Sequence, residues 1–138
     1  MISNYEKKRL FDLRYGDGTY TQASPLYFAL FTSAPNAGGG GVECIIGTNA
    51  YARASIASTA ANFPAATLGS PGTNGAVITW PAPTGAWGGG QPITHWGVFD
   101  AATGGNLIEF GELATPITIT GVAAAPYIPV GGLTIDSA

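Results

Sequence analysis

Charged side chains are scarce in this 138-residue chain, at 9 % of all residues, against roughly 25 % in an ordinary globular domain. Between Arg53 and Asp100 the sequence contains no Lys, Arg, Asp or Glu at all. A surface with so little charge keeps little electrostatic repulsion between copies, which favours a protein that packs against neighbours. The formal net charge of −3 argues against nucleic-acid binding, because that function depends on a basic face.

Cysteine and histidine are each represented by one residue, Cys44 and His95. One cysteine makes no internal disulfide, and one cysteine with one histidine assembles no metal cluster. We expect Cys44 to be a buried or half-buried thiol and His95 to be structural, since its neighbours in the sequence include no nucleophile or orienting carboxylate. Glu109 and Glu112 are three residues apart on a predicted strand, so they point to opposite faces. We therefore expect no catalytic residue, cofactor or metal site, and the remote alternative is an esterase or peptidase.

The chain also lacks a long hydrophobic run. The basic residues at 7–9 are followed by the mixed segment 10–14 and not by the apolar core of a signal peptide. The most apolar stretch, residues 121–135, is interrupted by Pro126, Pro129 and two glycines, which makes it a poor membrane span. These features predict no membrane partner and assembly in a cytoplasm.

Glycine and proline are abundant instead, with 21 and 10 residues, and this composition suits short strands joined by tight turns. The length suits one domain with one core. Short apolar or alternating segments predict about eight strands, at residues 26–32, 51–56, 76–80, 94–99, 107–112, 116–120, 127–128 and 133–135. The sequence therefore predicts an all-β fold, a jelly-roll-like antiparallel β-sandwich of about eight strands with a short N-terminal helix.

The helix is expected within the first 15 residues. Ser3 or Asn4 can cap it, and glycine follows its last residue. Tyr5, Leu10 and Leu13 would form one apolar stripe. A helix of this length is marginal alone, so it must dock on another surface.

We divide the chain into an N-terminal helical arm, residues 1–18, and a single β-sandwich domain, residues 19–138. Four of the five basic residues lie on the arm. One interpretation is a solvated helix face, and the other is an arm that docks on an acidic neighbouring subunit. The candidate partner-interface residues are Tyr5, Lys7, Lys8, Arg9, Arg14 and Trp87.

The three tryptophans allow two interpretations. Trp80 and Trp96 lie in predicted strands and suit a core or an interface, whereas Trp87 lies in a glycine-flanked loop. A loop tryptophan of this kind is often exposed, so we expect Trp87 to contact a partner. In the alternative, exposed aromatic side chains at the edge of the sandwich stack on sugar rings.

Three segments of the sequence resemble a widespread family of small virion proteins in tailed bacteriophages. They are Leu26–Pro35, Tyr51-Ala52-Arg53 and His95–Leu107, of which the last is the most specific. The resemblance covers residues 1–136. It implies a jelly-roll sandwich without catalytic residues, in a family whose members are labelled tail-fibre-like or capsid decoration (cement) proteins.

We therefore predict a capsid decoration protein on the capsid surface of the virion, where it bridges major capsid subunits. A protein that binds only the assembled lattice stabilises that lattice by mass action, and many weak contacts add up through multivalency. The predicted partners are the major capsid protein and copies of itself, as a dimer or trimer. The alternative is a tail-fibre or receptor-binding module that contacts host surface glycan, and copy number per virion separates the two.

Overall fold

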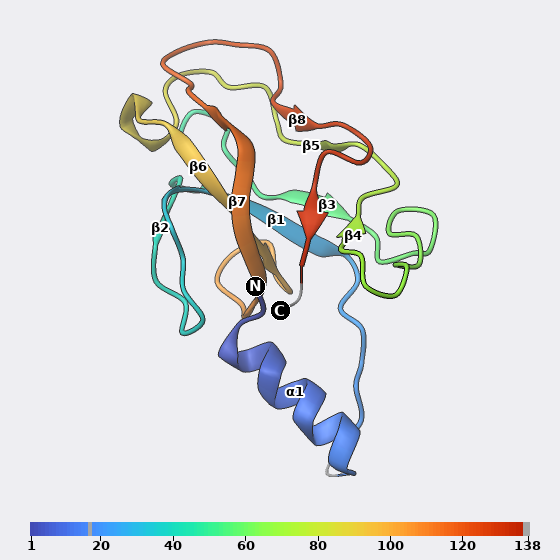
Figure 1. The fold of residues 1–138 in the computed structure, drawn as a ribbon. Helices are drawn as coiled ribbons and strands as arrows, with labels where there is room; N and C mark the ends of the chain where they lie inside the picture. The colour runs from blue at the N-terminus through green and yellow to red at the C-terminus, as the bar shows by residue number, and fades with distance from the viewer. Residues whose placement is uncertain (17, 137–138) are drawn as a thin grey trace.

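The computed structural model describes residues 1–16 and 18–136, which contain one α-helix, one 3-10 turn (Gly88–Gly90) and nine strands (Figure 1). The elements are α1 (Asn4–Tyr15), β1 (Leu26–Ser33), β2 (Val42–Glu43), β3 (Ala54–Ile56), β4 (Gly72–Thr73), β5 (Ile78–Thr79), β6 (Ile93–Phe99), β7 (Leu107–Ile117), β8 (Tyr127–Ile128) and β9 (Thr134–Ile135). This arrangement confirms the predicted all-β sandwich with a short N-terminal helix. No helix in the described ranges has the length and apolar character needed to cross a membrane.

The main sheet has the strand order β2-β1-β6-β7, and β3 pairs with the first half of β1. All pairs are antiparallel. β1 is the central strand, and its apolar run is buried from Phe28 to Phe31 because both faces of the sheet are covered there. In the β1–β6 ladder, Leu30 lies opposite Trp96 and Phe28 lies opposite Val98.

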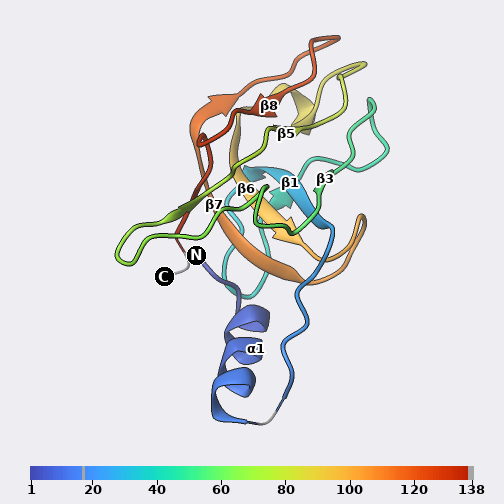
Figure 2. The ribbon, with the colours of Figure 1, turned by 90° about the vertical axis from the view of Figure 1, so that its right-hand side faces the viewer.

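The second layer consists of two separate ladders, β5 with β8 and β4 with β9, together with long loops (Figure 2). The core lies between this layer and one face of the main sheet. It includes Phe28, Leu30, Trp96, Val98, Ile78, Trp80, Ile128 and Leu133. The second layer is thus held by side-chain burial more than by strand pairing, because each of its ladders is only two residues long.

The opposite face of the main sheet buries a smaller aromatic group. Phe31 and Phe99 stack with ring centroids 6.3 Å apart. Gly97 lies beneath them, and a Cβ at this position would lie 2.9 Å from a ring carbon of Phe31 and 3.1 Å from Leu107. Glycine is therefore required for the two aromatic rings to approach the sheet.

Two details of the strand prediction were wrong. Residues 107–112 and 116–120 were expected as separate strands, but β7 runs without interruption from Leu107 to Ile117. Pro116 does not end it, because β7 is an edge strand, where a missing N–H group is tolerated. The two-residue strands β2 and β4 were not predicted, since such short ladders have no periodic sequence pattern.

The expectation that Trp87 is exposed is also wrong. Its side chain is 1 % exposed and belongs to the core, as do Trp80 and Trp96. The Trp87 indole N–H donates a hydrogen bond to the Asn49 carbonyl oxygen at 2.8 Å, and its ring meets Tyr51 edge-on. The flanking glycines let the loop fold inward, so that the indole fills the core and its one polar atom is satisfied. The Trp87 side chain is therefore not accessible to a partner.

Candidate docking site on the N-terminal arm

The arm begins at the open edge of β7, and Ser3 determines its direction. The Ser3 backbone N–H donates to the Ile108 carbonyl oxygen at 2.9 Å, as in a sheet. The Ser3 hydroxyl accepts a hydrogen bond from the Glu6 N–H at 3.1 Å and donates one to the Leu107 carbonyl oxygen. The predicted cap is thus confirmed, with a typical contribution of about 1 kcal/mol. Because the same hydroxyl also binds β7, it anchors α1 to the sandwich.

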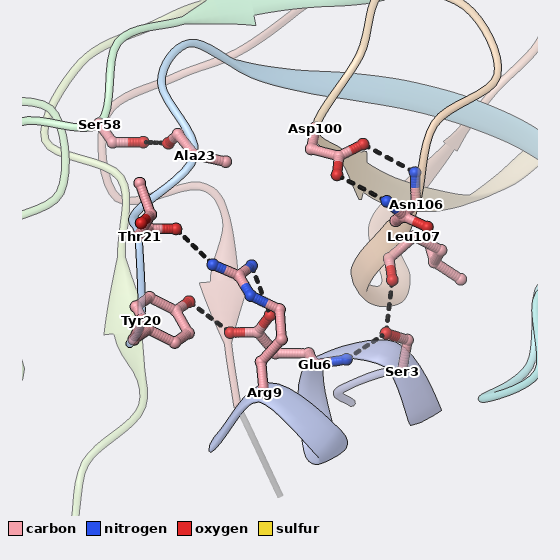
Figure 3. A network of polar contacts seen from close by, with 10 residues as sticks. All are labelled: Ser3, Glu6, Arg9, Tyr20, Thr21, Ala23, Ser58, Asp100, Asn106 and Leu107. Atoms are coloured by element: carbon pink, nitrogen blue, oxygen red, sulfur yellow. Dashed lines mark hydrogen bonds and ion pairs between the residues drawn. The ribbon is translucent and has the colours of Figure 1, made fainter. Parts of the chain in front are cut away.

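Glu6 is the only residue of α1 that is buried, with 5 % of its surface exposed. Its carboxylate accepts hydrogen bonds from the Tyr20 hydroxyl and, at 3.1 Å, from the Arg9 guanidinium (Figure 3). Arg9 also donates to the Thr21 carbonyl oxygen and lies 4.1 Å from the centre of the Tyr20 ring. These contacts join α1 to the segment that returns to β1. The arm is therefore a helix cross-linked to an extended segment.

The Glu6 contact makes the stability of the arm dependent on pH. Burial, together with the nearby Glu6 carboxylate, raises the pKa of the Tyr20 hydroxyl from 10.0 to about 12. Since the folded pKa lies above the unfolded one, this contribution is complete below pH 10 and is lost as the pH rises toward 12. We expect the urea midpoint of the wild type to fall more steeply above pH 10 than that of Tyr20→Phe. Parallel profiles for the two proteins would contradict this assignment.

α1 carries five large apolar side chains that remain partly exposed, and they lie on different sides of the helix. Their exposed fractions range from 36 % at Leu10 to 66 % at Tyr15, with Tyr5, Phe11 and Leu13 between these values. The rings of Phe11 and Tyr15, one turn apart, touch with their centroids separated by 4.7 Å. The predicted stripe of Tyr5, Leu10 and Leu13 does not form a separate apolar face, because the apolar side chains are distributed around the helix. An apolar surface of this kind marks an interaction site.

The basic residues of the arm have two different roles. Lys7, Lys8 and Arg14 lie on the exposed surface of α1, and Lys8 forms an ion pair with Asp12 four residues along the helix. Arg9 was predicted as a partner contact, but the structure binds its guanidinium within the arm. Sequence reasoning missed this because the partners Tyr20 and Thr21 come close only when the chain turns back after α1.

A third ion pair, which the sequence did not indicate, stabilises the loop between β6 and β7. The Arg53 guanidinium donates to both carboxylate oxygens of Glu43 at 2.8 Å and to the carbonyl oxygens of Ala101 and Gly104 at 2.8 Å. It also lies 3.7 Å from the centre of the Phe99 ring. The Arg53 side chain is only 4 % exposed. The cluster also forms part of the wall of a groove of about 610 Å³.

This cluster brings together two of the segments that carry the family resemblance, residues 51–53 and 95–107. In the sequence, the only indication of this cluster was that Arg53 lies in the segment 51–53. Its partners lie 10 to 51 residues away, so no local pattern could pair them.

Cys44 lies in the core and its thiol is not activated. Burial raises the pKa of Cys44 from 9.0 to about 11, and the side chain is 2 % exposed. We expect the native protein to react with a thiol reagent near pH 8 at least ~100-fold more slowly than the urea-unfolded chain, because the thiolate is rare and shielded. Equal rates in the two states would contradict this.

Within the described part of the chain, no group of three His, Cys, Asp or Glu side chains is placed to hold a metal ion.

The fold is a small all-β domain with an N-terminal helix that carries exposed apolar side chains. A family model described as podophage GP4 fiber I protein gp80 matches residues 1–136. The chain belongs to this family and is therefore a structural virion protein of a tailed bacteriophage. No curated protein matches the sequence.

Proposed function

We propose that this protein is a structural subunit of the virion fibre and that the exposed surface of α1 attaches it to the assembly. The observation that carries the proposal is the match to a fibre protein family over residues 1–136. The arm supports it, because a rigidly anchored helix with five exposed apolar side chains is built for contact with another protein. The protein acts by binding and has no catalytic role.

The fibre assignment favours the alternative over our main sequence-based hypothesis. A family named for a fibre protein gives no support to a capsid decoration protein that bridges major capsid subunits, and that function stays a prediction. The tryptophan rings that were candidates for stacking on host glycan are not accessible, because Trp80, Trp87 and Trp96 are each at most 2 % exposed. We therefore propose a structural role in the fibre, and a glycan contact through these tryptophans is not part of the proposal.

Copy number and position in the particle test this function. Purified virions are separated by electrophoresis, and the band of this protein is compared with that of the major capsid protein. Intact virions are also labelled with gold-conjugated antibodies. We expect a small number of copies and gold at the tail. Copies in the range of the capsid lattice, with gold over the capsid, would overturn the proposal in favour of the decoration function.

A further inference from the structure

We propose that two copies of this chain pair through antiparallel arms. The outer half of each α1 carries the rings of Phe11 and Tyr15, and the Phe11 ring occupies an apolar pocket at the base of the other copy's arm. We call this cavity the root pocket. Insertion of a ring into a pocket fixes how the two copies fit together. This proposal does not depend on whether the protein lies in the fibre or on the capsid.

The root pocket is an opening of the core beside the return segment of the arm. It has a volume of about 160 Å³, large enough for an aromatic ring, and its walls include Tyr20, Ala23, Leu26, Phe63, Ile108 and Ile135. Several of these side chains pack against the core and remain partly exposed. The Ser58 hydroxyl binds the Ala23 carbonyl oxygen and closes one side (Figure 3). The pocket thus offers an apolar surface with a fixed shape.

The arm cannot fill the pocket of its own chain. The tip of α1 is the part of the arm farthest from the sheets (Figures 1 and 2). Twelve helical residues place it roughly 18 Å from the root. Two arms that lie side by side in opposite directions bring each tip to the other root. A twofold axis between them repeats the same contact twice, as an isologous dimer requires.

The charge distribution favours a second copy as the occupant. Residues 1–16 carry four basic and two acidic side chains, whereas residues 18–136 carry one basic and five acidic ones. Arg14 lies three residues after Phe11, on the same side of the helix. The exposed residue Asp136 follows Ile135, which lines the root pocket. Insertion of the Phe11 ring therefore brings Arg14 toward Asp136 of the partner subunit.

The apolar surface on offer is sufficient for a dimer. Phe11 and Tyr15, which are 62 % and 66 % exposed, present roughly 250 Å² per arm. Two arms and the surfaces they cover then bury about 1,000 Å² in total, the lower limit for a specific interface. Without a partner, this surface would remain in water on a helix too short to be stable alone.

Sedimentation equilibrium of purified full-length chains tests the pairing. We expect a wild-type dimer and a monomeric Phe11→Ser/Tyr15→Ser double variant. Tyr127→Ser is the matched control, because Tyr127 is 61 % exposed on β8, at the far end of the sandwich, and its removal should leave the dimer intact. Circular dichroism verifies that all three proteins are folded. A monomeric wild type, a trimer, or a double variant that remains dimeric would overturn the proposal.

Disulfide trapping tests the exchange of tip and root. In a Cys44→Ser background, a Phe11→Cys chain is mixed with an Ala23→Cys chain under mild oxidation. We expect a cross-linked heterodimer in excess of both homodimers, and no such excess when the Tyr127→Cys chain replaces the Ala23→Cys chain. The charge contact is tested by Arg14→Glu, which should weaken association at least tenfold, and by addition of Asp136→Arg, which should restore it. Absence of the Phe11–Ala23 cross-link in a confirmed dimer would refute the arm exchange.

Discussion

Trp80→Ala is expected to lower the free energy of unfolding by about 4 kcal/mol. The Trp80 side chain is 1 % exposed and joins the second layer to the main sheet. Its indole N–H donates to the Phe28 carbonyl oxygen at 2.9 Å. Truncation creates a cavity and leaves this buried carbonyl without its partner. Domains of this size have about 5–15 kcal/mol in total, so the variant would lose at least about a quarter of the stability.

Urea unfolding followed by far-ultraviolet circular dichroism measures this loss, with Trp80→Phe as the control. Phenylalanine keeps most of the ring volume but provides no hydrogen-bond donor, so we expect a loss of about 2 kcal/mol. The difference between the two variants separates packing from hydrogen bonding. A loss below about 1.5 kcal/mol in Trp80→Ala would mean that the ladders of the second layer are held by other contacts.

Arg53→Ala is expected to have the second largest effect, a loss of about 3 kcal/mol. The substitution leaves the Glu43 carboxylate, whose side chain is 19 % exposed, without its charged partner. It also removes the two hydrogen bonds to the carbonyl oxygens of Ala101 and Gly104 and the contact with the Phe99 ring. The loop between β6 and β7 should therefore become mobile as well as less stable. Hydrogen exchange should show loss of protection at the Asn106 amide, which is bound to Asp100 at 2.7 Å in the same loop.

A double-mutant cycle with Glu43→Ala provides the quantitative test. Because the two side chains share two hydrogen bonds, the losses should not add, and we expect a coupling energy of at least about 1 kcal/mol. When both side chains are removed, neither charge is left buried without a partner, so the double variant avoids that loss of stability. The double variant should therefore be little less stable than Arg53→Ala. Strictly additive losses would show that the Arg53 effect comes from the loop contacts alone.

The predictions that held depend on local physical rules. The helix was placed from a capping serine, a glycine stop and the spacing of apolar residues, and Ser3 and Gly16 perform these roles at its two ends. The run that became β1 was recognised because a central strand is apolar on both faces. Turn signals located β6 and the start of β7. Each of these patterns is complete within about a dozen residues.

The predictions that failed depend on contacts between distant residues. Trp87 was expected at the surface because glycine flanks it, yet the Asn49 carbonyl oxygen, 38 residues away, receives its indole N–H in the core. The contact of Arg9 with a partner stays a prediction, and the sequence did not show that the return of the chain brings Tyr20 and Thr21 to its guanidinium. Neither partner is marked by any periodic pattern, so single-sequence reasoning had no means of pairing them.

The amino-acid sequence alone determined that this protein is a small all-β domain with a capped N-terminal helix and little charge, because strand, turn and cap preferences act over a few residues. Only the tertiary structure decided which of its side chains remain available to a partner. Burial and pairing depend on which segments meet in space. The three tryptophans and Arg9 were drawn inside, and the apolar surface of α1 was left exposed.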